Sequence, residues 1–414
     1  MESLTPPDWQ GARWIGSVDL CSVVQHSRLK LLDSGGYERA RLLVREGSSV
    51  RGFVDVEAPG GLVDCGLLTA AVEALPEARA TSASDSTPAI TVIVCTRDRA
   101  SHLRGSLAAI LRLDYPNFEV LVVDNAARTT ETRDIVRDEF RDPRVSLIAE
   151  RVPGLAHARN TGLRHARGDI VAFTDDDTVV DQGWLREIAV GFRRAPNVAC
   201  VSGLVPAGEL RTRTQAYFED RVSWSKNIEP KVFSLAEPPA DLPMFPFTSG
   251  AFSTGANFAL DRRTALSIGA FDTAFGAGTR TGGAEDIDMF TRLILNGHTL
   301  VVEPAAIVWH RHRDDVDALR LQARAYGNAL GAWITKLLMD PRTARLALAR
   351  SPHAVRRLLS LAQGTAEKPA GAATESLDEW DREIARIGRL ELISVARGPL
   401  NYLLQRRSGE RVAR

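Results

Sequence analysis

The chain has 414 residues, of which 44% are hydrophobic, 25% charged and 6% aromatic. This composition provides enough apolar material for a sizeable core and excludes wholesale disorder, and the length suits two or three domains. Lys and Arg together number 52, as do Asp and Glu, so the formal net charge is zero and no general nucleic-acid-binding role is expected.

Cysteine spacing and the N-terminal residues bear on the cellular compartment. None of the four cysteines forms a Cys-x-x-Cys pair, so no zinc ribbon or redox pair is expected and a reducing compartment fits. Met1 is followed by acidic and polar residues, which predicts that there is no signal peptide. No run of about 18 apolar residues is present, so no membrane span is expected. We therefore predict a cytoplasmic protein.

The first 80 residues differ in pattern from the rest of the chain. Short apolar runs alternate with turns rich in Gly and Ser, and a helical pattern then covers Leu67 to Leu75. This pattern predicts a small β-rich module with one helix over residues 1–80. Residues 78–88 are small and polar without periodicity, which is typical of a linker.

From residue 89 onward, strand and helix patterns alternate. Short apolar runs typical of buried strands cover 90–95, 118–123, 145–148 and 170–173, and the segments between them, 101–113, 131–140 and 155–166, have helical spacing. This alternation predicts a mainly parallel sheet with helices on both faces, over residues 89–314. Ligands bind such sheets at the carboxyl ends of the strands, where Thr96, Arg97, Asp98, Asp124 and Asp175 all fall.

Three adjacent carboxylates, Asp175, Asp176 and Asp177, come directly after the last of these strands. Because the carboxylates repel one another, they need a countercharge or a solvated setting. Mg²⁺ and Mn²⁺ accept carboxylate oxygens together with substrate phosphates, so a metal site is one interpretation. A solvated turn or helix N-terminus is the other.

Two further motifs lie downstream. Glu285 and Asp286 open a helix after a Gly-rich stretch, 276–282, which could move as a lid. Such acidic residues either favour a helix N-terminus or place a general base at the rim of a site. His310 and His312 come after the strand at 300–302, and one of the two could complete a metal shell. The sequence leaves open which one.

Residues 315–414 are predicted to form a basic, helical C-terminal region. Helical patterns cover 318–339, 344–362 and 377–404, with a loop at 364–376. Basic and apolar residues mix at 356–359 and 400–407, as in amphipathic helices that lie on anionic membranes; an ordinary helical subdomain is the alternative. The aromatic-rich stretch 206–250 is interpreted either as an acceptor site or as packing against this region.

Taken in order, these motifs resemble family 2 glycosyltransferases of the GT-A fold. The resemblance covers about residues 90–313, and it is carried by 94–99, 122–125, 154–162, 166–177, 255–259, 285–286 and 309–310. It implies a GT-A-like α/β fold, flanked here by the N-terminal module and the C-terminal helices.

The resemblance also implies an activity. A sugar would move, with inversion, from a UDP- or dTDP-linked donor to a hydroxyl of a glycan, lipid-linked or small-molecule acceptor, with Mg²⁺ or Mn²⁺ as cofactor. Together with the basic and apolar C-terminal segments, this activity suggests a role in cell-surface polysaccharide biosynthesis and a peripheral location on the inner face of the plasma membrane.

The same resemblance implies roles for individual residues. Asp286 matches the catalytic base, with Glu285 beside it. The metal ligands would be Asp175, Asp177 and His310. The nucleotide-sugar would be bound by Thr96, Arg97, Asp98, Asp124, Arg159, Asp175, Asp176 and Asn257, with Asp124 accepting a hydrogen bond from the base.

Two alternatives to this function remain open. A sugar-nucleotidyltransferase would share the sheet and the metal carboxylates but should carry a Gly-rich phosphate loop after the first strand, which 97–101 lacks. A catalytically inactive nucleotide-sugar-binding protein should have lost the metal pair or the base, and both are present in the sequence.

Overall fold

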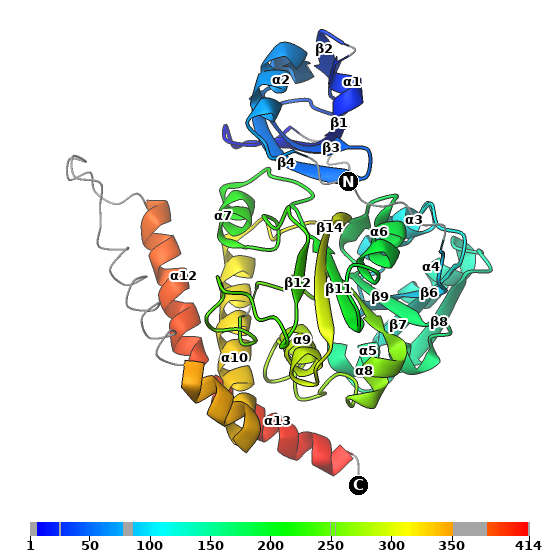
Figure 1. Ribbon diagram of the computed structural model, residues 1–414, viewed down its shortest axis with the longest axis vertical. Helices are drawn as coiled ribbons and strands as arrows, with labels where there is room; N and C mark the ends of the chain where they lie inside the picture. Colours follow the sequence, from blue (N-terminus) through cyan, green and yellow to red (C-terminus); the bar gives the residue numbers. More distant parts are fainter. Residues whose placement is uncertain are drawn as a thin grey trace.

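The computed structural model describes residues 6–24, 26–77, 86–248, 250–252, 254–350 and 379–412. A small N-terminal sheet, a large central sheet flanked by helices, and a group of C-terminal helices succeed one another along the chain (Figure 1). The predicted α/β fold, with a mostly parallel sheet, is confirmed. Most of the predicted linker at 78–88 lies outside the described residues.

The N-terminal module contains two small sheets. One consists of β1 (Trp14–Asp19), β3 (Arg39–Glu46) and β4 (Ser49–Glu57); the other pairs β2 (Arg28–Lys30) with β5 (Leu62–Asp64). The predicted helix is α2 (Cys65–Glu73), which Asp64 caps by accepting from two backbone N–H groups. A second helix, α1 (Leu20–Val24), and a 3₁₀ turn, η1 (Pro59–Gly61), are too short to have a recognisable sequence period.

The module packs against the central domain through a small apolar cluster and an ion pair. Leu43 of β3 is fully buried against Leu204 and Ile307 of the central sheet. Beside this cluster, the guanidinium of Arg45 donates to both carboxylate oxygens of Asp181. The N-terminal module therefore lies against the central sheet, near the end of its longest strand.

The central sheet has nine strands, in the order β10-β14-β11-β13-β9-β6-β7-β8, with β12 also paired to β14. The strands are β6 (Ile90–Thr96), β7 (Phe118–Asn125), β8 (Val145–Glu150), β9 (Ile170–Asp175), β10 (Thr178–Val180), β11 (Val198–Leu204), β12 (Lys231–Phe233), β13 (Asn257–Asp261) and β14 (Thr299–His310). Strands β6 to β9 match the four predicted strands. Strands β10, β12 and β13 run antiparallel to their neighbours.

Helices cover both faces of the sheet, as the alternating pattern predicted. One face packs against α5 (Leu155–His165), α8 (Arg262–Ser267) and α9 (Glu285–Leu295). The other packs against α3 (Ala100–Ile110), α4 (Glu131–Asp138) and α6 (Trp184–Gly191). Strand residues such as Val92, Ile93 and Val94 are completely buried because both sides of the sheet are covered.

Strand β14 determines which residues meet at the edge of the sheet. Its first part pairs with β11 and β12, and its last residues pair antiparallel with β10, with His310 opposite Thr178. Because β10 begins directly after the Asp run that ends β9, this pairing brings His310 next to Asp177 although the two are far apart in the sequence.

The C-terminal helices are α10 (Val316–Met339), a helical segment at 341–350, α12 (Glu379–Val395) and α13 (Gly398–Val412). Within the helical pattern predicted over 377–404, a turn at residues 396–397 separates two helices, and Gly398 and Pro399 begin the second. Gly398 also packs closely on α10, where a Cβ would come within 2.4 Å of the Gly331 backbone. The predicted loop at 364–376 and most of the 344–362 helix lie outside the described residues.

The aromatic residues of 206–250 serve two purposes. Phe233 and Phe245 are buried in the core of the central domain, and Phe247 packs edge-on against Trp333 of α10. Phe218, on α7 (Arg213–Arg221), and Trp224 instead line a cavity. Within the described part of the chain, no helix combines the length and the apolar character needed to cross a bilayer.

Candidate active site

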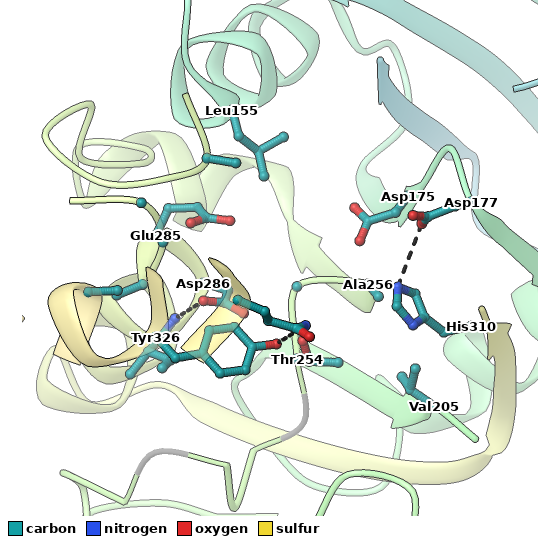
Figure 2. Close-up of a pocket in the computed structure, with 18 of the residues that line it drawn as sticks. Leu155, Asp175, Asp177, Val205, Thr254, Ala256, Glu285, Asp286, His310 and Tyr326 are labelled. Carbon is teal, nitrogen blue, oxygen red and sulfur yellow. Dashed lines mark hydrogen bonds and ion pairs between the residues drawn. The ribbon is translucent and has the colours of Figure 1, made fainter. Parts of the chain in front are cut away.

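A cavity of about 760 Å³ opens at the carboxyl ends of the parallel strands. Its lining brings together three segments that the sequence analysis singled out: the Asp run, the Glu285-Asp286 pair and His310. Asp175, Asp177 and His310 lie at one side, and Glu285 and Asp286 at another (Figure 2). The rest of the lining includes residues from α7, α10 and α12.

Arg99 provides the countercharge that the Asp run needs. Its guanidinium donates to Asp176 Oδ1 and to Asp177 Oδ2, each at 2.7 Å. The hydroxyl of Thr96 donates to the other Asp176 oxygen, also at 2.7 Å. Both oxygens of Asp176 therefore accept hydrogen bonds from the protein. In Asp177 only Oδ2 accepts from Arg99, and Oδ1 faces His310 instead. Asp176, expected to bind the nucleotide-sugar, lines the cavity, and its two oxygens also hold the turn together.

Arg159 is the second cation of the site, and unlike Arg99 it is buried. It is 2% exposed, and its guanidinium donates to Glu285 Oε1 and to the carbonyl of Gly255, both at 2.9 Å. Asp175 Oδ1 lies 3.8 Å from the same guanidinium. A larger residue at position 255 would crowd the site, because its Cβ atom would lie 3.0 Å from the side chains of both Arg159 and Asp286.

Three Phe rings surround the guanidinium of Arg159. Its central carbon lies 5.3 to 5.8 Å from the centroids of Phe173, Phe258 and Phe271, a range suited to cation–π contact. In this apolar setting, burial raises the pKa of Asp175 and of Glu285, and the positive charge of Arg159 opposes that rise. The cation thus keeps both carboxyls closer to their ionised form.

Asp175, Asp177 and His310 form a group of potential metal ligands. One oxygen of each carboxylate and one imidazole nitrogen lie within 4.8 Å of one another. Nε2 of His310 lies 3.6 Å from Asp177 Oδ1. Burial lowers the pKa of His310 to about 4, against the opposing effect of Asp177, so the ring is neutral at neutral pH. Neutral imidazole is the form that binds metals.

A chain of hydrogen bonds continues from His310 into the protein. The Nδ1 atoms of His310 and His312 lie 3.3 Å apart, and Nε2 of His312 is 2.8 Å from Glu219 Oε2. His312 is only 2% exposed, and Phe218 packs edge-on against its ring. Of the two candidate histidines, His310 faces the Asp run and His312 lies behind it.

Asp286 and Glu285 occupy different environments although they are adjacent. Glu285 is buried and engaged with Arg159. Asp286 lines the cavity at the first turn of α9, and its Oδ1 accepts from the backbone N–H of Ile287 at 2.8 Å. Asp286 is thus the carboxylate of the pair that is available to a bound molecule.

The residues expected to bind the nucleoside are only partly at the cavity. Thr96 and Arg97 line it, but Asp98 turns away and accepts from the backbone and side chain of Arg128, both at 2.8 Å. Asp124 is 6% exposed beside Thr96, and its Oδ1 has no hydrogen-bond partner among the described residues. Burial raises the pKa of Asp124, and Asp98 adds to this effect.

Asn257 does not reach the cavity. Its amide donates to the carbonyls of Leu204 and Ala306 at 3.0 and 2.8 Å, and its oxygen accepts from the indole N–H of Trp184 at 2.8 Å. The side chain is completely buried, so it joins three strands of the sheet to α6. Its expected contact with the nucleotide-sugar does not fit this environment.

Several residues of the site received no role from the sequence. Arg99 comes directly after the Thr96-Arg97-Asp98 turn, and the need of the Asp run for a countercharge was a signal that could have pointed to it. Glu219 and the cavity-lining residues of α10 gave no such signal, because only the folded chain brings them to the site.

Comparison with known proteins agrees with this arrangement. Residues 91–264 match the model of a family described as Glycosyl transferase family 2. The match includes the Asp run, Arg99 and Arg159. The central domain of the chain therefore matches this family, as the motifs indicated.

Two relatives and one solved structure show the extent of similarity. The pre-mycofactocin glycosyltransferase of Mycobacterium tuberculosis is 27% identical over 243 residues, which are 58% of this chain and 46% of that protein. The glucosyl-dolichyl phosphate glucuronosyltransferase of Haloferax volcanii is 23% identical over 191 residues, 45% of this chain and 57% of that protein. This chain thus spans about half the length of these curated relatives. A structure of the mannosyltransferase PcManGT from Pyrobaculum calidifontis with GDP-Man and Mn²⁺ has 22% identity and a TM-score of 0.48, over 76% of this chain and 88% of that chain.

Arg159→Met tests the buried charge cluster. We expect it to lower the free energy of unfolding by about 3–5 kcal/mol, because Glu285 would remain buried without a cation. The measurement is urea denaturation at pH 7 monitored by tryptophan fluorescence. Adding Glu285→Gln to this variant should recover part of the loss.

Arg167→Met is the matched control, since Arg167 also pairs with a glutamate, Glu119, but its side chain is 76% exposed. It should leave the unfolding midpoint nearly unchanged, because exposed ion pairs contribute little. Equal midpoints for the two Met variants would contradict the role given to Arg159.

Proposed function

We propose that this chain is a metal-dependent glycosyltransferase that moves a sugar from a UDP- or dTDP-linked donor to an acceptor hydroxyl, with inversion. The observation that carries this proposal is the position of the Asp175, Asp177 and His310 ligand group in the same cavity as Asp286. The ligand group suits the charged diphosphate end of a donor, and the separate carboxylate suits removal of a proton.

The hydrogen-bond chain behind His310 supports a cation at this place. In the tautomer in which only Nε2 of His312 carries a proton, this nitrogen donates to Glu219, and Nδ1 of His312 accepts from Nδ1 of His310. Nε2 of His310 then carries a lone pair that faces Asp177 Oδ1 at 3.6 Å. Two electron-pair donors facing each other in this way fit a divalent cation between them, and oxygen and imidazole ligands suit Mn²⁺ or Mg²⁺.

Different protein groups would act on the two ends of the reaction. Asp286 takes the proton from the acceptor hydroxyl as its oxygen attacks the anomeric carbon of the donor. The bond from that carbon to the diphosphate oxygen breaks, and the nucleoside diphosphate leaves with the electron pair. A bound divalent cation would offset the charge that develops on the leaving diphosphate. One displacement at the anomeric carbon inverts its configuration.

The nucleoside end of the donor would lie near Asp124. Its Oδ1 is a buried acceptor without a partner among the described residues, which suits the N–H of a uracil or thymine ring. Arg97 lines the adjacent part of the cavity, where it can contact the ribose or a phosphate. Arg159, fully engaged with Glu285, Gly255 and Asp175, is better suited to fix the carboxylates than to bind the nucleotide directly.

The alternatives have less support. A sugar-nucleotidyltransferase would need a phosphate loop after β6, and that segment is instead the Asp98 turn, bound to Arg128. A catalytically inactive binding protein would not need a carboxylate that is available to take a proton. Asp286 is such a carboxylate, because it lines the cavity, whereas Glu285 is the member of the pair that binds Arg159.

Asp286→Asn and Asp177→Ala separate the two ends of the mechanism. We expect Asp286→Asn to reduce sugar transfer by about 10²–10⁴-fold, the usual effect of removing a general base, and to keep binding UDP with Mn²⁺. Asp177→Ala should lose Mn²⁺ binding itself. Nucleoside diphosphate release from a panel of UDP- and dTDP-sugars measures transfer, and titration calorimetry measures binding.

The surface variant Asp317→Asn controls for loss of a carboxylate, since that side chain is 84% exposed. It should behave like the unmodified protein. If Asp286→Asn transfers sugar at the full rate, Asp286 is not the base. If the unmodified protein releases no nucleoside diphosphate from any donor, the proposed activity is wrong.

We also propose that the C-terminal helices contact an anionic membrane, where a lipid-linked acceptor would be found. Four large apolar side chains on these helices are 42% to 71% exposed: Leu392, Ile393, Leu400 and Leu403. Exposed basic residues lie near them in the sequence, namely Arg389, Arg397, Arg406 and Arg407. Apolar side chains flanked by basic ones are typical of helices that lie at a membrane surface.

Flotation with phosphatidylglycerol vesicles tests this contact. The full chain should float with the vesicles at low salt, and Leu392→Asp with Leu400→Asp should remove most of the bound fraction. Leu32→Asp is the control, because Leu32 is 76% exposed on the N-terminal module. Absence of flotation for the unmodified protein, with or without a nucleotide-sugar, would contradict the proposal.

A further inference from the structure

One face of α10 forms a wall of the cavity beyond the base. The residues that line it are Gln322, Tyr326, Ala329, Leu330 and Trp333, which recur at intervals of about one helical turn and so lie on one side of the helix. Helix α10 begins at Val316, beyond the 91–264 match to the family model. This wall is therefore built by a part of the chain that the family match does not cover.

Two polar atoms on this wall are buried without partners. Trp333 is 3% exposed, and its indole Nε1 has no hydrogen-bond partner among the described residues; the same is true of Gln322 Oε1. The other end of the Gln322 amide donates to the Tyr326 hydroxyl at 3.0 Å, which fixes its orientation. A buried donor or acceptor without a partner is costly, and both of these atoms belong to residues that line the cavity, which points to a ligand that pairs with them.

The wall lies on the acceptor side of the proposed reaction. Tyr326 is beside Asp286, whereas Asp175, Asp177 and His310 are across the cavity from it (Figure 2). A donor whose diphosphate lies at the metal ligands would present its sugar toward Asp286. The acceptor would approach Asp286 from the other side and would contact α10. An ion pair between Arg221 of α7 and Glu391 of α12 also lines the cavity.

We propose that the α10 wall is an acceptor subsite that binds a sugar ring, so that the acceptor is a glycan or a glycosylated molecule whose terminal sugar receives the new residue. This inference rests on the proposed transferase function. Tyr326 and Trp333 would contact the apolar C–H face of the ring. Trp333 Nε1 would donate to one ring hydroxyl, and Gln322 Oε1 would accept from another.

The chemistry of the wall favours a sugar over an aliphatic chain. A sugar carries hydroxyls, which both donate and accept, next to C–H groups that pack on aromatic rings. A plain alkyl alcohol has a single hydroxyl, which could pair both polar atoms only by lying between them, and the rest of its chain has no polar group to offer. Sites built to hydrogen-bond a hydroxyl discriminate strongly against ligands that lack it.

Saturation-transfer NMR with methyl glycosides tests the subsite. The probes are methyl glycosides of common hexoses, N-acetylhexosamines and deoxyhexoses, with 1-hexanol for comparison, added to the full chain with UDP and Mn²⁺. At least one glycoside should bind, and 1-hexanol should not. Trp333→Phe, which keeps a ring but removes the N–H, and Gln322→Leu should each weaken that glycoside about 10-fold.

Ile334→Ala is the matched control, because Ile334 is on α10 but 39% exposed and not part of the cavity lining. It should leave glycoside binding unchanged. Thermal melting and UDP binding verify that each variant is folded. If Trp333→Phe is unfolded, Gln322→Leu alone decides the result.

The outcomes distinguish the subsite from the proposed function on which it rests. If UDP and Mn²⁺ bind but no glycoside does, or if 1-hexanol binds as well as the glycosides, the subsite is wrong and the transferase proposal remains. If folded Trp333→Phe and Gln322→Leu bind the glycoside like the unmodified chain, the assignment of these residues is wrong. If UDP with Mn²⁺ does not bind the unmodified chain, both proposals fail.

Discussion

The site depends on how two arginines offset a concentration of buried carboxylates. Asp175, Asp176, Asp177 and Glu285 all lie at or beside one cavity, and such a group would repel itself without cations. Arg99 binds Asp176 and Asp177, and Arg159 binds Glu285 close to Asp175. Each arginine leaves some carboxylate oxygens open, and Oδ1 of Asp177 is the one that faces His310.

This arrangement separates the cavity into regions with different chemistry. The ligand group at the edge of the sheet is held by strand pairing, since β14 places His310 beside β10. The base stands at the first turn of α9, where the backbone N–H of Ile287 holds one of its oxygens. The far wall comes from α10, which close contacts at Gly327 and Gly331 hold against α12 and α13. The domain that matches the family thus carries the Asp run, and the C-terminal helices shape the other end.

Much of this architecture can be predicted from local sequence pattern. The four β-branched runs and the helical segments between them lie where the alternation predicted, because strands buried on both faces and amphipathic helices have distinct periods. The rule that ligands bind at strand carboxyl ends correctly brought Thr96 and Asp175 together. The break between α12 and α13 was missed because apolar spacing continues across Gly398 and Pro399.

The directions of individual side chains could not be predicted in the same way. Asp98, Asp176 and Asn257 occur in motifs that resemble binding sites, yet each directs its polar atoms to the protein itself. Those partners come from distant segments, as for Thr96 and Asp176, which are 80 residues apart, so no local pattern reveals them. The choice between His310 and His312 likewise depended on Glu219, which lies 93 residues from His312.

The central claim is that Asp175, Asp177 and His310 hold a divalent cation. Electron spin-echo envelope modulation of Mn²⁺ added to the full chain with UDP measures this directly, because it detects a coordinated imidazole nitrogen. We predict a nitrogen signal for the unmodified chain and for His298→Gln, a surface control, and its loss in His310→Gln. No protein-dependent Mn²⁺ signal, or an unchanged nitrogen signal in His310→Gln, would contradict the account.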